Sequence, residues 1–180
     1  EPTNWSKVSI SLQDSSYHSE LAVLFGDGKA MKDVIALATD EDADVASRTK
    51  ALETLVASRP PELQAICEKL LGHRYLCRIA VKGLAGFDDP ELGKTIVSKY
   101  KKYFKPPYRE PFIDVLCTRP EWALEMLAGV ERNRIDRGHI TPYHARQILN
   151  LGNDELSTRL TQVWGELKTS SEDKLKQIQE

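Results

Sequence analysis

The chain has 180 residues, of which 41% are hydrophobic and 29% charged, and its formal net charge at pH 7 is −2. These values are typical of one soluble globular domain with a substantial core. They exclude a protein that attracts DNA or an anionic membrane through a strong overall field. No apolar run approaches the about 20 residues that a membrane-spanning helix needs.

The first residues carry little information about the fold. The chain opens on EPTNWSKVSI, without a start methionine or a signal peptide, which favours a mature product or an excised piece of something longer. We expect residues 1–16 to form an irregular segment. Apart from KVSISL at 7–12, no stretch alternates apolar and polar residues as a half-buried strand does, so we expect no sheet.

Most of the remaining chain has the period of an α-helix. The segment PELQAICEKLL places apolar residues at offsets 0, 3, 4, 7 and 8, which lie on one face of a helix. These residues are Leu63, Ile66, Cys67, Leu70 and Leu71. The same pattern recurs in AMKDVIALA, YLCRIAVKGLAGF, ELGKTIVSKYKKYF and ELSTRLTQVWGEL, so the sequence predicts an all-α protein.

Prolines recur at intervals of 30 residues, each with a glutamate close behind, at Pro60, Pro90 and Pro120. Proline is tolerated in the first turn of a helix, where its missing N–H would have no partner. A residue of a type that caps helices stands two positions before each proline. These residues are Ser58, Asp88 and Thr118, and the pattern predicts three helix starts.

Each predicted start opens the second helix of a two-helix unit. We expect one repeat domain over 17–180, with helix pairs near 17–39, 43–71, 73–104, 107–131 and 141–167 and a terminal helix at 171–179. A helix pair that recurs about every 30 residues is typical of an α-solenoid. A HEAT-like or armadillo-like superhelix fits best, and an irregular helical bundle with coincidental prolines is the alternative.

The sequence predicts no catalytic, cofactor-binding or metal-binding residue. None of the four histidines forms HExxH or pairs with a cysteine at zinc spacing, and GxSxG, P-loop and GxGxxG motifs are absent. The acidic stretch TDEDAD at 39–44 is interpreted as a solvated turn at a helix N-terminus rather than a calcium loop. An enzyme with an unrecognised site that uses Glu121, Asp136 or His144 is a less favoured alternative.

The three cysteines are Cys67, Cys77 and Cys117, and no pair has CxxC spacing. We expect all three to be small buried core residues. A disulfide between Cys67 and Cys77 is the alternative.

The segment KTIVSKYKKYFKPPYREP is the most suggestive surface, because basic residues from position 94 to 109 interleave with aromatic ones and no acid stands between them. Basic side chains of this kind can bind a nucleic-acid backbone, and the aromatic ones can stack on bases. A solvated helix end explains the composition more simply. A second basic stretch, ERNRIDRGH, has the same simple explanation. The candidate partner surface comprises Lys99, Lys101, Lys102, Lys105, Arg109, Arg134 and Arg137.

Residues 118–174 carry a resemblance to a known family. The matching features are Arg119-Pro120 with Trp122, then NRIDRGHI, HARQILNLG at 144–152 and VWGELKTSSEDK at 163–174. This stretch resembles the helical-repeat region of large exported multidomain proteins of planctomycete-type bacteria. Those proteins are described as membrane-bound dehydrogenases with a C-terminal haem-binding, cytochrome c-like domain. The looser repeats from about 43 to 117 are consistent with this likeness.

The resemblance implies a spacer or docking module between redox domains, in the periplasm or an equivalent compartment. The chain departs from the family in having no CxxCH, so we expect no covalent haem and no other cofactor. The expected function is a noncatalytic HEAT-like scaffold for a protein partner or for neighbouring domains of the same polypeptide. The alternative is a nucleic-acid-binding domain that uses the 94–109 patch.

Overall fold

A computed structural model of the chain describes residues 28–100 and 105–165, and in these ranges all regular secondary structure is helical. The prediction of an all-α protein is therefore confirmed for this part of the chain. The expected irregular segment 1–16, the first helix of the 17–39 pair and the terminal helix 171–179 lie outside the described residues. Over the described ranges no helix combines the length and the apolar character needed to cross a bilayer.

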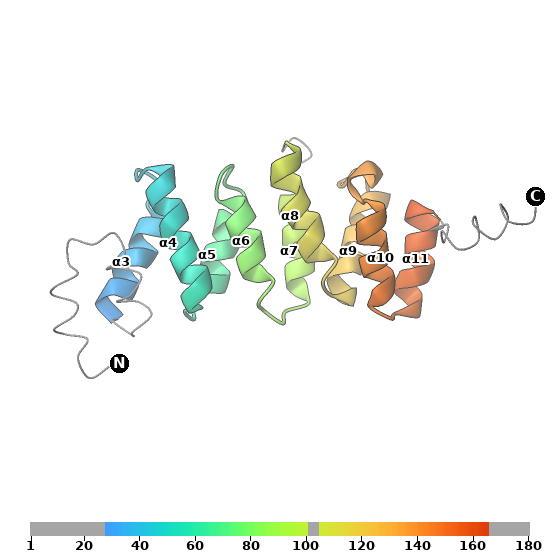
Figure 1. Cartoon of the computed structure of the whole chain (residues 1–180), viewed down its shortest axis with the longest axis horizontal. Coiled ribbons are helices and arrows are strands. Elements are labelled where there is room, and N and C mark those ends of the chain that lie inside the picture. The colour runs from blue at the N-terminus through green and yellow to red at the C-terminus, as the bar shows by residue number, and fades with distance from the viewer. Residues whose placement is uncertain (1–27, 101–104, 166–180) are drawn as a thin grey trace, which may run out of the picture. The chain divides into compact units, whose positions relative to one another are not determined.

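The chain divides into two compact units, with the boundary between Phe87 and Asp88. Within each unit short loops join the helices, and consecutive α-helices run in opposite directions (Figure 1). Unit 1 contains α3 (Gly28–Thr39), α4 (Val45–Ser58), α5 (Leu63–Leu70) and α6 (Cys77–Leu84). Unit 2 contains α7 (Glu91–Lys99), α8 (Pro106–Leu116), α9 (Pro120–Glu131), the 3-10 helix η1 (Arg137–His139), α10 (Pro142–Asn150) and α11 (Asp154–Trp164).

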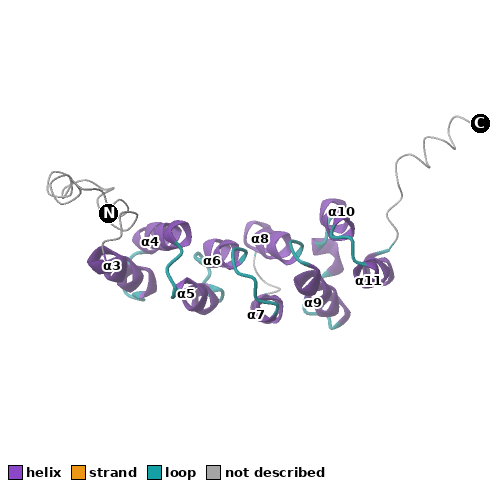
Figure 2. Ribbon diagram, turned by 90° about the horizontal axis from the view of Figure 1, so that it is seen from below, coloured by secondary structure: helices purple, strands orange, loops and turns teal. Residues whose placement is uncertain are grey.

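Each unit is built of two layers of helices. In unit 1, α3 packs against α4, α5 packs against α6, and α4 lies beside α6. Figure 2 shows α4 and α6 in one row and α3 and α5 in the other. In unit 2, α9 lies between α7 and α11 in one row, and α8 and α10 form the second row (Figure 2).

The predicted apolar stripes form the core. All five residues of the stripe from Leu63 to Leu71 are at least nine-tenths buried. Leu52 and Leu55 of α4 and Leu76 and Leu84 around α6 are fully buried in the same unit. Burying one such side chain stabilises the fold by about 1.5–3 kcal/mol, so these stripes decide which face of each helix turns inward.

The prolines mark helix starts as predicted. Helix α7 begins directly after Pro90 and α9 begins at Pro120, whereas α5 begins three residues after Pro60. At the start of α7 the Asp89 carboxylate accepts the backbone N–H of Glu91 at 2.9 Å. Helix α11 is capped by Asn153, whose Oδ1 accepts the backbone N–H of Leu156 at 2.9 Å.

The three caps predicted two residues before the prolines are wrong. Ser58 is the last residue of α4, and its hydroxyl donates to the Thr54 carbonyl at 2.8 Å. The Thr118 hydroxyl donates in the same way to the Val115 carbonyl at 2.7 Å, at the end of α8. Short hydroxyl side chains bond readily to nearby carbonyls of the preceding turn, so both residues finish one helix instead of starting the next. Asp88 instead forms an exposed pair with the Arg119 side chain at 3.5 Å.

The three cysteines are buried free thiols, as predicted for core residues. Burial raises the pKa of both the Cys67 and the Cys117 thiols to about 12. A thiol that stays protonated is a poor nucleophile, so both side chains act as small hydrophobic groups. The alternative of a Cys67–Cys77 disulfide is not realised.

Glycines allow neighbouring helices to approach closely in both units. A Cβ at Gly83 of α6 would lie 2.8 Å from Cys67 Sγ and 2.9 Å from a methyl carbon of Val56. A Cβ at Gly93 of α7 would lie 2.9 Å from Cδ1 and 3.0 Å from Cα of Trp122. Trp122 is fully buried and donates its indole N–H to the Asp89 carbonyl at 2.9 Å, which fixes α9 against the start of α7.

We expect Gly93→Ala to lower the free energy of unfolding by about 1–3 kcal/mol, because the added methyl group would overlap the main chain of α9 at Trp122. Helix propensity alone predicts the opposite, a gain of about 1 kcal/mol. The measurement is urea denaturation followed by circular dichroism. Gly72→Ala is the control, because nothing lies within 4 Å of a Cβ at that position. Equal stabilities for Gly93→Ala and the parent would contradict this account of the packing.

Candidate partner-binding surfaces

The predicted basic surface is only partly described, because Lys101 and Lys102 lie outside the described residues. Lys99 is exposed at the end of α7, and Lys105 is exposed immediately before α8. Arg134 and Arg137 are exposed in the connection between α9 and α10. Arg109 differs from these residues, since it is half-buried and lies within α8.

Arg109 joins the two basic stretches through a chain of hydrogen bonds. Its guanidinium donates from Nη1 to His139 Nε2, in the helix η1 that also contains Arg137. A guanidinium can only donate, so His139 Nε2 is an acceptor and Nδ1 carries the proton. Nδ1–H therefore donates to the Tyr100 hydroxyl oxygen, 2.7 Å away. The structure thus connects residues that are 30 and 39 positions apart in the sequence.

Burial sets the protonation states in this chain of hydrogen bonds. It lowers the pKa of His139, and the neighbouring Arg109 cation acts in the same direction, while Asp136 opposes both. Burial also raises the pKa of Tyr100 to about 12. At neutral pH both groups are therefore uncharged, and Arg109 is the only cation of the three.

Acidic side chains interrupt the basic surface in unit 2. Glu110 is exposed next to Arg109, and Asp136 is exposed next to Arg137. Asp136 also caps η1, because its Oδ1 accepts the backbone N–H of Gly138 at 2.8 Å. The cations therefore share this surface with acids, and do not form a continuous positive face.

His144 has a structural role. It is 3% exposed; its Nδ1 accepts the Thr141 backbone N–H at 3.1 Å, and its Nε2–H donates to Asp114 Oδ1 at 3.0 Å. Together with Thr141 it forms the capping box of α10. A Thr–His–Asp series resembles the order of a nucleophile, a base and an acid. Here the lone pair of Nδ1 is already occupied by a backbone N–H, so the arrangement secures the start of a helix.

The other residues of the enzyme alternative are also accounted for structurally. Glu121 is exposed in the first turn of α9, where a carboxylate is favoured by the helix dipole, and Asp136 caps η1. Among residues 28–100 and 105–165, no three His, Cys, Asp or Glu side chains gather as a metal ion requires. Asp44 of the acidic stretch caps α4 by accepting the Ser47 N–H at 2.9 Å. Hydrogen bonding with Ser47 lowers the pKa of the Asp44 carboxyl.

Unit 2 has a hollow of about 330 Å³, here named the α8–η1–α10 pocket. Arg109 and Ile113 line it from α8, His139 from η1, and Thr141 and His144 from the start of α10. Most polar side chains that line this pocket are already hydrogen-bonded: Arg109 to His139, and His144 to Thr141 and Asp114.

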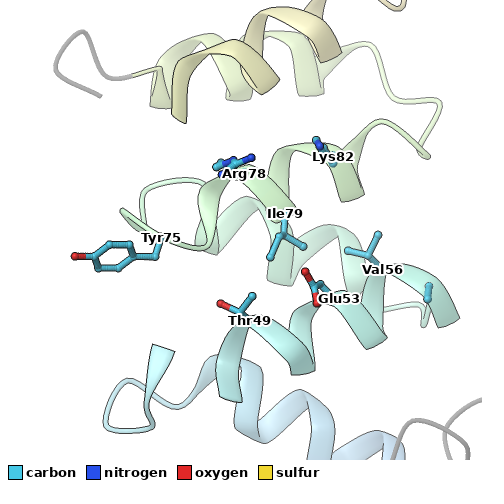
Figure 3. A pocket seen from close by; sticks show the side chains of 8 residues that line it. Thr49, Glu53, Val56, Tyr75, Arg78, Ile79 and Lys82 are labelled. Atoms are coloured by element: carbon cyan, nitrogen blue, oxygen red, sulfur yellow. The ribbon is translucent and has the colours of Figure 1, made fainter. Parts of the chain in front are cut away.

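Unit 1 has a larger hollow of about 530 Å³ between α4 and α6, here named the α4–α6 groove (Figure 3). Figure 3 shows Ile79 pointing from α6 toward α4, on which Glu53 lies, and Tyr75 extending away at one end. Val56 and Ala57 complete the apolar part of the lining, and Arg78 and Lys82 form its basic part.

The basic side of the α4–α6 groove lacks acidic partners. Arg78 and Lys82 are exposed, and within the described ranges neither forms an ion pair. The Arg74 guanidinium lies over the ring of Tyr75, 5.4 Å from its centroid. The sequence analysis did not identify this surface. The signal was present, because Arg74, Arg78 and Lys82 recur every four residues and Tyr75 stands next to the first of them.

Comparison of the chain with protein-family models, with curated proteins and with solved structures gave no match. A functional assignment for this chain therefore depends on its sequence and on the geometry of its described residues.

We expect the stability of the protein to fall as the pH is lowered from about 7 to 5, in part because of His139. Its folded-state pKa lies below its ordinary value of 6.5, so the unfolded chain takes up a proton more readily in this range. His139→Gln should show a shallower decline than the parent in urea denaturation at several pH values. The two proteins are compared relative to pH 8, where the histidine is neutral in both states. Parallel declines would contradict this assignment.

Proposed function

We propose that this chain is a noncatalytic, HEAT-like repeat scaffold that holds a protein partner, or neighbouring domains of a larger exported redox protein, through helices of one layer in each unit. The observation that carries the proposal is the placement of the two hollows. In unit 1 the hollow lies between α4 and α6, and in unit 2 helices α8 and α10 line it. In each unit these are the helices of one layer.

The layered packing within each unit supports this proposal. Proteins built of stacked helix pairs present extended surfaces whose exposed side chains bind partners. Here α6 and α10 each begin near an exposed aromatic residue, Tyr75 at 48% and Tyr143 at 60% relative exposure. Tyrosine is enriched at protein–protein interfaces, because it offers a large rigid apolar area together with a hydroxyl group.

The roles of the buried polar groups also support a scaffold. His144 and Thr141 cap α10, and Cys67 and Cys117 are core residues with pKa values raised by burial. The hydrogen bonds of the cap occupy the His144 ring, and burial keeps the two thiols protonated, so these groups are poorly suited to catalysis. The exported redox context depends on the sequence resemblance of residues 118–174 alone.

A nucleic-acid-binding domain is the second candidate. The contact between Arg109 and His139 favours it, because it brings Arg109, the last residue of the basic stretch, to the helix η1 that contains Arg137. The exposed acids Glu110 and Asp136 weaken it, since they would lie beside any phosphate held there. The protein scaffold is therefore the better-supported function.

Photocrosslinking tests the scaffold. We expect benzoylphenylalanine at Tyr75 or Tyr143 to crosslink the chain to the separately expressed polypeptide that flanks it in its parent protein. The same residue at Ala65, exposed on α5 in the other layer of unit 1, is the control. Equal crosslinking from all three positions, or none from the two tyrosine positions, would contradict the proposal.

Duplex DNA binding tests the second candidate. We expect no binding of labelled duplex DNA at about 50 mM salt beyond that of a protein of equal net charge, measured by fluorescence anisotropy. Binding that weakens steeply with salt and is lost on Arg109→Gln together with Arg137→Gln would favour the nucleic-acid function instead.

A further inference from the structure

The α4–α6 groove combines an apolar floor with a basic wall, and this combination identifies the chemistry of its ligand. We propose that the groove binds an acidic polypeptide segment that inserts one aliphatic or aromatic side chain between α4 and α6. This inference rests on the proposed scaffold function and names the class of partner.

The basic wall consists of two cations on one side of α6. Arg78 and Lys82 stand four residues apart in this helix, which places them one above the other, and Arg74 lies in the turn that precedes the helix. The segment 74–84 contains no acid, and Arg78 and Lys82 form no ion pair with any described residue. Like charges at this spacing repel one another, so an acidic partner would relieve a repulsion that exists in the free protein.

The floor of the groove is apolar and partly open to solvent. Ile79, Val56 and Ala57 line the hollow of about 530 Å³. Ile79 and Val56 are half-buried, and Ala57 is exposed. A volume of this size accommodates a leucine or phenylalanine side chain and part of its backbone. Tyr75 stands at one end, with the Arg74 guanidinium over its ring. Tyrosine and arginine are among the residue types that most often dominate binding energy at interfaces.

The opposite wall sets the orientation of the ligand and distinguishes a peptide from a nucleic acid. Glu53 is exposed on α4 and lines the groove across from the basic row. A polypeptide can turn its acidic side chains toward α6 and its backbone N–H groups toward Glu53. A nucleic acid carries phosphates along its whole length and would bring some of them against this carboxylate.

The test uses fluorescein-labelled peptides and the complete chain. The probe is a short peptide with one leucine flanked by aspartate and glutamate, and its binding is measured by fluorescence anisotropy. We expect saturable binding that weakens with added salt, because the ion pairs at the rim of the groove are screened. Arg78→Glu combined with Lys82→Glu should weaken binding about tenfold or more, since it replaces attraction by repulsion.

A matched control separates the groove from the overall charge. Lys32→Glu combined with Lys69→Glu changes the net charge equally, but these exposed residues lie on α3 and α5, in the other layer. We expect this variant to bind within about twofold of the parent. Ile79→Gln tests the floor without changing charge and should weaken binding severalfold. Circular dichroism and urea denaturation establish that each variant is folded.

Three results would overturn the inference: equal weakening by both charge variants, full binding by Ile79→Gln, or preference for a peptide in which lysine replaces the acids. Absence of binding by the acidic peptide would also overturn it. None of these results depends on crosslinking at Tyr75. Crosslinking from Tyr75 without acidic-peptide binding would leave the scaffold standing and refute the partner class, whereas loss of both would refute the scaffold as well.

Discussion

A helix of eight or nine residues is not stable alone in water, because its few hydrogen bonds do not offset the cost of ordering the backbone. Helices α5 and α6 have eight residues, and α7 and α10 have nine. Each therefore depends on burying its apolar stripe against a neighbour. The glycines Gly83 and Gly93 serve this constraint, because they let the helices approach closely enough for the stripes to meet.

Polar side chains are engaged at the ends of several helices. The first N–H groups of any helix have no partner within it, and side chains can accept them. His144 and Thr141 do so for α10, Asp44 for α4 and Asn153 for α11. Residue types that could perform chemistry thus hold helices in place.

The two hollows differ in how much of their polar lining is free to bind. In the α8–η1–α10 pocket, the histidines bond to Arg109, Tyr100, Thr141 and Asp114. In the α4–α6 groove, by contrast, Arg78 and Lys82 have no acidic partner among the described residues. Exposed cations without an acidic partner, beside an apolar floor, make the groove the better candidate for a ligand, although the sequence pattern indicated the basic residues of unit 2 instead.

The sequence by itself determined the helices, the prolines that mark their starts and the stripes that are buried, because these features follow from a local period of 3.6 residues. It did not determine the caps, since a hydroxyl such as that of Ser58 or Thr118 can bond to the helix before it as well as to the one after it. Only the tertiary structure decided the bonding of Arg109 to His139 and the groove of Tyr75 and Ile79 against α4. Those contacts join residues about 20 to 40 positions apart, and no local pattern specifies which helices lie side by side.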